Sequence, residues 1–495
     1  MGCVFTALII AVGYFLFGVG ADTPLFNDLQ QVDVVTQDKG DLVIAYSQPL
    51  STYEPMVSDR VTRQYLSNVY EGLARFDVNL KLEPALALSW GMVDDHLWQV
   101  KLRPEVRFHD DSTFNAEDVV ASVERAKMHV SSQRQGLVEG IERVDVIDDF
   151  TLQFRTMYPD PLLMHKLTLL PMVPSGLANQ ISMPVGTGPY QFNSASGGEW
   201  MFDFFEDYWG GTPAYSNLIF KHLPDKVARY DAILNGEVDV LGEVPPIFVE
   251  PLLDQSIQVA SLPSLEVNFL LFNREKDDSP FRHEAVRRAF TYLVDPVRIE
   301  KLTGGYGRSI GQFVSRGVFG YNPQIDPVIY DPNQARALLS DFADEIVIDF
   351  PEGLEALGSY FVSELAEIEV SATVNYWPVD QYDEHVLSGE SDVFFFGWKS
   401  DLGDAAPFFS SLVHSEGALN AGIIKDVGLD DQIEQMDRNV LETIRTDQLQ
   451  SLMRLVVEEE VIGLPLFESD TLVGVGPSLV WNPRIDNLIL ATDFR

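Results

Sequence analysis

The alternation of apolar and polar residues along the chain predicts a mixture of short strands and amphipathic helices. An apolar run at 42–46 is suited to a buried strand, and strict alternation at 98–103 predicts a strand with one buried face. Apolar residues recur at helical spacing between Val61 and Leu73, which predicts an amphipathic helix over that segment. No fixed repeat period runs through this mixture, so we expect an α/β or α+β multidomain protein rather than a solenoid.

Capping residues indicate where some of the helices begin and end. Asn115 is a good N-cap for a helix whose first turn carries two carboxylates, which the helix dipole favours. The pair Asp331-Pro332 predicts a second helix start. A further apolar helix face, over 286–293, is expected to end at Asp295-Pro296.

Length and charge narrow the classes of protein. At 495 residues the chain is too long for one ordinary core, and two or three domains are expected. It carries 34 Lys and Arg against 75 Asp and Glu, a formal net charge of −41. Such a surface repels phosphates, which disfavours binding to nucleic acid. We interpret the acidic excess as a solubility adaptation; a field that attracts cationic ligands is the alternative.

The first residues are typical of an export signal. No charged residue occurs from Gly2 to Ala21, and the apolar run is followed by Val19-Gly20-Ala21, a plausible cleavage site before Asp22. The usual positively charged start is missing. Because the run approaches the roughly 20 residues that span a bilayer, residues 1–21 are either a signal peptide or an uncleaved anchor. We expect a periplasmic protein, free or anchored to the outer face of the inner membrane.

Sequence signatures of catalysis are scarce. The chain has no phosphate-binding P-loop and no nucleophile elbow, and none of its eight histidines has another three or four residues away. Its one cysteine, Cys3, excludes an intrachain disulfide and a Cys-based zinc site. We therefore expect no enzyme, no cofactor and no metal site. An exported hydrolase is the remote alternative, and it would need a nucleophile and a base that no motif indicates.

One aromatic and acidic cluster, at 394–409, suggests ligand binding. The run 393–396 predicts a buried strand, and the end of this strand carries Trp398 and Asp401. A carboxylate beside an indole suits a ligand with an ammonium group: the carboxylate accepts a charge-assisted hydrogen bond, and the indole adds a cation–π contact. A core tryptophan and a loop-capping aspartate are the alternative interpretation.

Several motifs along the chain, taken in order, resemble those of the extracytoplasmic solute-binding family 5, the oligopeptide-, dipeptide- and nickel-binding type that serves ABC importers. The similarity runs from about residue 42 to the C-terminus and is carried by segments 70–73, 83–90, 98–119, 184–190, 207–209, 234–239, 281–290, 398–404 and 464–466. The loop after Trp398 departs from the family pattern Asp-Tyr-x-Asp-Pro, because Asp401-Leu402-Gly403-Asp404-Ala405 lacks the tyrosine and the proline. That departure leaves the ligand class open.

The resemblance implies a bilobed, periplasmic-binding-protein-like α/β fold of type II with an extra domain and the ligand between the lobes. Lobe I would combine segments 41–73, 185–265 and 465–495. The extra domain would span 74–184, and lobe II would span 266–464.

The resemblance also implies a function. Asp401 would pair with the N-terminal amine of a bound peptide, and Trp398 would line a side-chain pocket. The protein would be the substrate-binding component of an ABC importer, a monomer that captures small peptides and delivers them to a permease and ATPase complex. The alternatives are the same fold with a sugar, an opine, or a metal or haem complex as ligand, and a periplasmic sensor.

Overall fold

The computed structural model describes residues 39–327 and 329–495. The predicted export segment at 1–21 lies outside these residues. Within the described part of the chain, no helix has both the length and the apolar character needed to cross a membrane.

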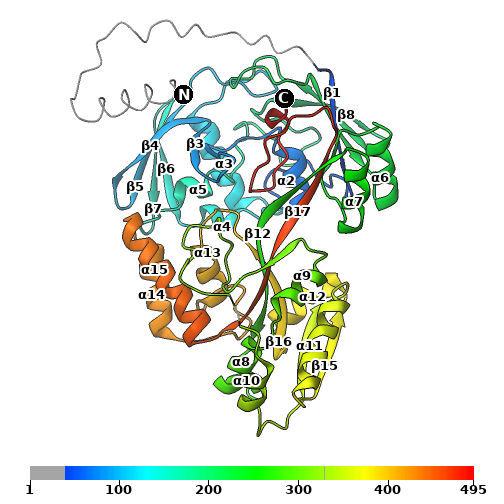
Figure 1. Cartoon of the computed structure of the whole chain (residues 1–495). Coiled ribbons are helices and arrows are strands. Elements are labelled where there is room, and N and C mark those ends of the chain that lie inside the picture. The colour runs from blue at the N-terminus through cyan, green and yellow to red at the C-terminus, as the bar shows by residue number, and fades with distance from the viewer. Residues whose placement is uncertain (1–38, 328) are drawn as a thin grey trace, which may run out of the picture. The chain divides into compact units, whose positions relative to one another are not determined.

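The largest element of the described chain is one mixed β-sheet of eleven strands (Figure 1). Ten of them follow the order β15-β14-β16-β12-β17-β11-β1-β10-β9-β8, and β13 pairs with β17. The predicted strand at 42–46 is β1, which pairs in parallel with β10 and β11. The bounds of the strands are β1 (Asp41–Tyr46), β8 (Tyr190–Ser196), β9 (Glu199–Phe204), β10 (Asn217–His222), β11 (Val240–Leu241), β12 (Gln258–Phe272), β13 (Gly307–Ser309), β14 (Ile346–Pro351), β15 (Ala372–Trp377), β16 (Val393–Lys399) and β17 (Gly463–Val475).

Two long antiparallel strands, β12 and β17, connect the two halves of this sheet. The end of β17 pairs with β11 on one side and with the start of β12 on the other, whereas the end of β12 pairs with β16. The β12–β17 register shifts between Pro263 and Val267, and Leu265 within this break has a φ of 59°. The boundary predicted between lobe I and lobe II falls at this irregularity. β12 and β17 are thus the two strands that run from one half of the sheet into the other.

A second, antiparallel sheet of four strands lies within segment 74–184, in the order β4-β5-β7-β6. Its strands are β4 (Ala87–Asp94), β5 (Leu97–Leu102), β6 (Ile141–Asp148) and β7 (Thr151–Thr156), and a separate pair is formed by β2 (Ala74–Phe76) and β3 (Leu82–Pro84). The alternating strand predicted at 98–103 is β5, with Trp98, Val100 and Leu102 buried. The prediction of one buried face is confirmed, whereas the domain boundaries themselves stay predictions.

Helices pack on both halves of the main sheet. α6 lies against β11 and α7 against β12, whereas α11 and α12 lie against β14. The bounds of the helices are α2 (Arg60–Leu66), α3 (Ala116–Met128), α4 (Gln135–Val138), α5 (Leu163–Lys166), α6 (Lys226–Leu234), α7 (Val249–Asp254), α8 (Glu284–Thr291), α9 (Pro296–Leu302), α10 (Pro332–Leu338), α11 (Glu355–Glu367), α12 (Val379–Leu387), α13 (Ala406–Phe408), α14 (Val427–Asp437) and α15 (Glu442–Arg454). Helices packed on a sheet with both parallel and antiparallel strands confirm the predicted α/β class.

Two predicted helix starts are confirmed by their caps. The side chain of Asn115 accepts a hydrogen bond from the backbone N–H of Glu117, and Asp118 accepts one from the backbone N–H of Asn115, both at 2.8 Å. This reciprocal pair is a capping box. At the start of α10, the Asp331 carboxylate accepts from two backbone N–H groups at 3.1 Å.

The helix predicted from Val61 to Leu73 is too long, because α2 ends at Leu66. Beyond it, the backbone pairs with distant segments: Gly188 N donates to Val69 O, and Leu73 N donates to Leu167 O. A Cβ on Gly186 would lie 2.0 Å from Val69 O, so only glycine allows the two chains to approach so closely. Tertiary partners therefore replace the helical hydrogen bonds that the apolar spacing suggested.

The predicted end of the helix over 286–293 is also wrong. α8 ends at Thr291, and Asp295-Pro296 starts the next helix instead. The Asp295 side chain accepts from the backbone N–H of Val297 at 3.0 Å, and Pro296 occupies the first helical position. Proline suits that position because its missing N–H would have no helical partner there.

One buried carboxylate joins three of the motifs that carry the family resemblance. Glu71 accepts hydrogen bonds from Thr187 Oγ1 at 2.8 Å, from Tyr208 OH at 3.1 Å and from Trp209 Nε1 at 2.9 Å. Burial raises the pKa of Glu71, although these three donors oppose the shift. The Glu71 side chain thus holds together the segments at 70–73, 185–190 and 207–209.

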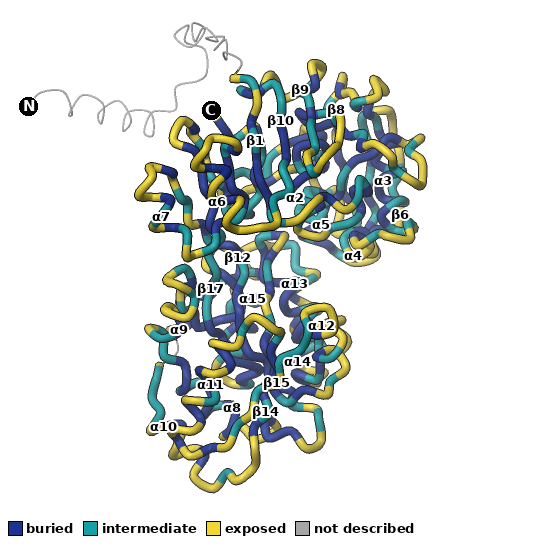
Figure 2. The backbone as a smooth tube through the Cα atoms, turned by 90° about the vertical axis from the view of Figure 1, so that its right-hand side faces the viewer, coloured by how far each residue is buried: buried dark blue, intermediate teal, exposed yellow. Residues whose placement is uncertain are grey.

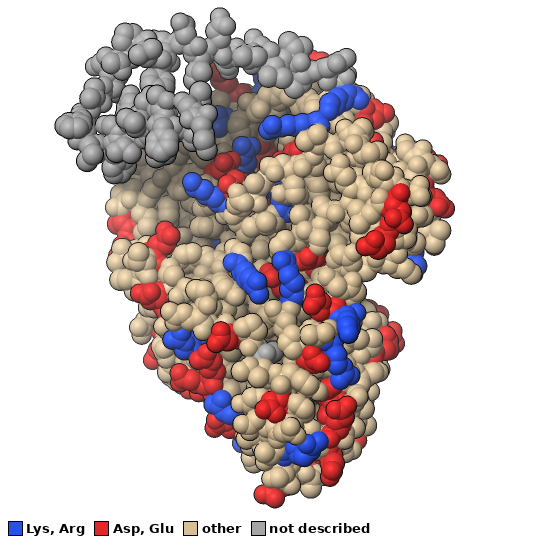
Figure 3. Space-filling view, in the orientation of Figure 1, with Lys and Arg blue, Asp and Glu red and all other residues tan. Residues whose placement is uncertain are grey.

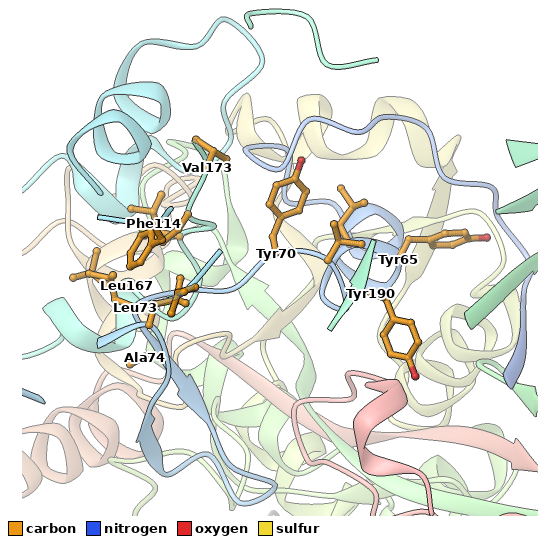
Figure 4. Close-up of a cluster of buried hydrophobic side chains, with 14 of the residues drawn as sticks. Tyr65, Tyr70, Leu73, Ala74, Phe114, Leu167, Val173 and Tyr190 are labelled. Atoms are coloured by element: carbon orange, nitrogen blue, oxygen red, sulfur yellow. The ribbon is translucent and has the colours of Figure 1, made fainter. Parts of the chain in front are cut away.

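A hydrophobic cluster surrounds the three segments that Glu71 holds together, and it connects segment 74–184 to the main sheet (Figure 4). In Figure 4, Leu73, Phe114 and Leu167 gather on one side and Tyr65 lies on the other, with Tyr70 between them. Figure 2 shows buried residues along the central strands, including β1 and β10. The core is therefore continuous between these two parts of the chain.

Candidate functional site

The loop that follows β16 is held in place by a buried ion pair. Arg445 Nη1 and Nη2 donate to the two carboxylate oxygens of Asp404 at 2.6 and 2.7 Å, and both side chains are about 95% buried. Asp404 N donates to Ser400 Oγ, and the Ser400 hydroxyl donates back to Asp404 O, both at 2.9 Å. Gly403 supplies the positive φ of 67° that closes the turn. These contacts hold the backbone of the loop in place on both sides of Asp401.

Asp401 contacts a cation from the other half of the main sheet. Arg63 on α2 donates from Nη1 to Asp401 Oδ1 at 2.5 Å. Burial pushes the pKa of Asp401 upward, but Arg63 and Lys399 outweigh burial, and the pKa lies below its usual range. The carboxylate is thus ionised at neutral pH, and its side chain stays 51% exposed. The ion pair bridges the segments predicted as lobe I and lobe II.

A second guanidinium, that of Arg134, lies behind this pair. Its residue is 7% exposed, and its hydrogen bonds go to backbone carbonyls: Nε donates to Pro55 O at 2.9 Å and Nη1 donates to Leu169 O. Burial and the nearby charge of Arg63 lower the pKa of Arg134 to about 10, with Asp401 opposing the shift. Among the described residues, no carboxylate forms an ion pair with Arg134. A buried cation in this state is costly unless an anion compensates it.

Lys399 adds a third cation beside the loop. Its ammonium donates to Asp486 O at 3.2 Å, and burial lowers its pKa, with Asp401 opposing the shift. Glu266, its cross-strand partner on β12, also lies near. Charged side chains of both signs, Lys399, Asp401 and Glu266, therefore lie near the end of β16, where β12 passes from one half of the sheet to the other.

Trp398, the other residue predicted for the site, lies on β16 with 8% of its surface exposed. Its ring meets that of Phe408 edge to face at a centroid distance of 5.6 Å. It belongs to the hydrophobic cluster that includes Leu402 and Phe409. The structure therefore places it beneath the Asp401 loop, and its role in a ligand pocket stays a prediction.

Three cavities lie around this region. One of about 170 Å³ is lined by Arg63 and Arg134 together with segment 66–76 and residues near Asp486. A second, of about 70 Å³, is lined by Lys399, Glu266 and Arg60, and a third, of about 500 Å³, shares Arg60 with it. The largest cavity has walls from both halves of the sheet, since Glu243 and Tyr306 both line it. The cavity of about 500 Å³ has room for a small solute by itself, and Asp401 lines none of the three.

One group of side chains has the residue types of a hydrolase triad. Ser391 Oγ lies 3.2 Å from His385 Nε2, and Asp349 Oδ2 lies 3.0 Å from the same nitrogen. In a working triad the serine and the acid contact different ring nitrogens, so this arrangement cannot pass a proton from the serine to the histidine while the acid orients the ring. Ser391 is also 2% exposed. The group stabilises the buried Asp349 carboxylate, whose pKa is lowered by these hydrogen bonds despite its burial.

No metal site is found in the described chain, since nowhere in 39–327 or 329–495 do three His, Cys, Asp or Glu side chains gather so that they could hold an ion. The site that the residues do form is one for recognising charge: a half-exposed carboxylate, two guanidiniums and adjoining cavities. Sequence reasoning singled out Asp401, whose role in ligand binding stays a prediction, and it did not single out Arg63 or Arg134. Neither arginine stands in a local motif, and both approach Asp401 only in the folded chain.

Comparisons with known proteins agree with this architecture. The sequence model of the bacterial extracellular solute-binding proteins, family 5 (middle), matches residues 81–420. The dipeptide-binding protein of Escherichia coli is 27% identical over 390 residues, which cover 70% of this chain and 72% of that protein. The haem-binding protein A of Haemophilus influenzae is 26% identical over 410 residues, covering 72% and 73%.

A solved structure shows the same fold. The ABC transporter substrate-binding protein CtaP of Listeria monocytogenes aligns with a TM-score of 0.83 at 19% identity, covering 92% of this chain and 99% of that one. The fold and the comparisons define the class, a bilobed extracellular solute-binding protein. The chain belongs to family 5 of the bacterial extracellular solute-binding proteins.

Proposed function

We propose that this protein captures a small peptide between its two lobes, outside the inner membrane, and delivers it to an ABC permease and ATPase complex. The observation that carries the proposal is Asp401, an ionised and half-exposed carboxylate that already binds a cation from the opposite lobe. A peptide's N-terminal ammonium is a cation of the same charge and can take the place of the Arg63 guanidinium. A charge-assisted hydrogen bond of this kind is worth about 1.5–3 kcal/mol.

Capture follows from closure of the lobes around the ligand. Among the described strands, β12 and β17 are the two that run continuously from one lobe into the other, and the register break near Leu265 gives the pair a place to bend. A ligand that contacts Asp401 on one lobe and the cavity walls on the other binds best when the lobes are close. Binding therefore shifts the population toward the closed form.

The relatives support the cargo and the partner. The matching Escherichia coli protein is named for dipeptide binding, and the matching Listeria monocytogenes protein is named as part of an ABC transporter. We propose the same role here, without catalysis, for a monomeric protein in the periplasm, free or anchored at the membrane.

The test is a thermal-shift and calorimetric screen of the purified full chain with di- to penta-peptides and their N-acetylated forms. A ligand at 100 times its dissociation constant adds about 2.7 kcal/mol to the free energy of unfolding. We expect free peptides to raise the unfolding midpoint and N-acetylated peptides to raise it much less. Asp401→Asn should weaken free peptides about tenfold or more and leave the acetylated ones unchanged.

The proposal fails if no peptide of any length shifts the midpoint, or if Asp401→Asn leaves the affinity for free peptides intact.

A second candidate function keeps the fold and changes the cargo. The loop after Asp401 departs from the family pattern, and the 500 Å³ cavity can hold a solute larger than a dipeptide. Haem and metal chelates therefore belong in the same screen, and a shift with them alone would support this alternative.

A further inference from the structure

The hairpin of β2 and β3 carries a leucine in an unusual backbone conformation. Leu80, in the turn of this hairpin, has a φ of 63°, which lies in the left-handed region that leucine seldom adopts. The turn is held in this shape by Asp77, whose carboxylate accepts hydrogen bonds from Asn79 N and Lys81 N, both at 2.8 Å. Strain of this kind persists where the surrounding structure imposes it, and it often marks a functional contact.

The Leu80 side chain packs against the loop that carries Asp401. A Cβ on Gly403 would lie 3.1 Å from Leu80 Cδ1 and 3.5 Å from Leu80 Cβ, so the leucine lies directly on the backbone of Gly403. In the described chain, the hydrogen bonds of the hairpin turn are made within the hairpin and to residues 484 and 485. The contact between Leu80 and Gly403 is therefore apolar packing, which separates without breaking a hydrogen bond of the turn.

A second leucine of segment 74–184 reaches the same part of the molecule. Leu162 is 7% exposed and belongs to the hydrophobic cluster that includes Trp398, and Leu80 packs against this cluster as well. Asp160 fixes the turn before α5, because its Oδ1 accepts a hydrogen bond from Leu162 N at 3.0 Å and its Oδ2 accepts one from Lys166 Nζ at 2.7 Å. The two leucines are thus both presented from turns that carboxylates hold in place.

These two contacts cross from one predicted lobe to the other. The Glu71 hydrogen bonds and the continuous core fix segment 74–184 to lobe I, whereas Gly403 and the cluster around Trp398 lie in the segment predicted as lobe II. When the lobes separate about β12 and β17, both leucines leave their partners and enter water. Exposure of apolar surface is unfavourable, so the two leucines favour the arrangement in which the lobes are together.

We propose that Leu80 and Leu162 form an apolar latch that holds the two lobes together outside the three cavities and opens when the lobes separate. In the mechanism of capture given above, the closed form binds the ligand. The apparent dissociation constant therefore varies inversely with the fraction of molecules in which the latch is closed. The latch itself is independent of the solute that is bound, and it is tested without a ligand.

Disulfide trapping tests the contact in solution. All variants carry Cys3→Ser, so that the introduced cysteines are the only thiols in the chain. The 3.5 Å between the two Cβ positions suits a disulfide, so Leu80→Cys with Gly403→Cys should crosslink under mild oxidation. The control combines Leu80→Cys with Gly353→Cys, because Gly353 also has a positive φ in the predicted lobe II but has no atom within 4 Å of its Cβ position. We expect the first pair to crosslink about tenfold faster or more.

Thiol labelling tests whether the latch opens. Leu162→Cys should react with a bulky maleimide whenever the lobes separate, whereas Leu412→Cys lies in the same cluster, is 0% exposed and comes from the predicted lobe II itself. We expect Leu162→Cys to be labelled about tenfold faster or more, because local opening is more frequent than unfolding of the cluster. Addition of Leu80→Ala to Leu162→Cys should raise the labelling rate about threefold, since one of the two contacts is lost. The unfolding midpoint of each variant shows that it is folded.

The two measurements decide between a latch and the alternatives. Selective crosslinking of the first pair, together with faster labelling of Leu162→Cys, supports the latch. If the control pair crosslinks as fast, there is no specific contact and the inference is overturned. It is also overturned if Leu162→Cys reacts no faster than Leu412→Cys, since the contact would then be permanent, or if Leu80→Ala leaves the labelling rate unchanged. All of these outcomes leave the proposed capture of peptides untouched.

Discussion

At the scale of single residues, the position of Asp401 depends on the side chain of Asp404, three residues further along the same loop. Asp404 is buried, and its carboxylate caps the turn, accepts from Ala406 N at 2.9 Å and receives both Arg445 nitrogens. Loss of one partner of a buried pair leaves an unpaired charge, which is more costly than the loss of an exposed pair. The conformation of the loop therefore depends on the ion pair between Asp404 and Arg445, which lies on helix α15.

Arg445→Met should lower the free energy of unfolding by about 3–5 kcal/mol, because it leaves the Asp404 carboxylate buried and unpaired. Urea denaturation of the full chain measures this loss. Arg438→Met is the matched control, since Arg438 forms an exposed pair with Glu434 and should cost less than about 1 kcal/mol. Equal losses in the two variants would contradict the role of the buried pair.

At the scale of secondary-structure elements, α2 positions the cation that meets Asp401. This helix has only seven residues, and its N-cap Asp59 accepts from the backbone N–H groups of Val61 and Thr62, both at 3.0 Å. Short helices depend on caps and tertiary packing more than on intrinsic propensity. The direction in which Arg63 points is thus tied to its cap.

Asp59→Ala should cost about 1 kcal/mol of stability and should also change ligand affinity, because α2 carries Arg63. Asp225→Ala is the control: Asp225 caps α6 with the same geometry, at 2.9 and 2.8 Å, and α6 carries no residue of the candidate site. Thermal unfolding and calorimetric titration of both variants provide the comparison. If both caps or neither altered affinity, α2 would have no special part in ligand binding.

At the scale of the whole molecule, the dominant feature is the net charge of −41. Figure 3 shows Asp and Glu side chains over the upper and lower parts of one face, with Lys and Arg among them. A net charge this far from zero keeps a protein soluble but destabilises the compact state through self-repulsion. The site stands out against this background because it gathers cations.

Salt should therefore stabilise the protein. Raising NaCl from low concentration toward 1 M shortens the screening length from about 30 Å at 0.01 M to about 3 Å, and the unfolding midpoint should rise by several degrees. Thermal unfolding in a salt series measures the effect, with sucrose at equal osmolality as the uncharged comparison. A midpoint that stays constant or falls in NaCl would show that self-repulsion is not a significant term.

The features that depend on near neighbours along the chain follow from the amino-acid sequence alone. β1 and β5 follow from apolar runs and alternation, and the caps at Asn115 and Asp331 follow from side chains that bond to the backbone two or three residues away. The order of the motifs was enough to expect the family. Asp401 was singled out for the same reason, because it lies two residues beyond the end of a recognisable strand.

The positions at which long-range partners replace local ones become visible only in the folded chain. α2 stops at Leu66 because the next backbone groups bond to Gly188, Tyr190 and Leu167. Arg63 and Arg134 reach Asp401 from positions more than 250 residues earlier in the chain, and no local pattern encodes such a meeting. Periodicity and capping act over a few residues, whereas charge pairing in the site depends on which distant segments the core brings together.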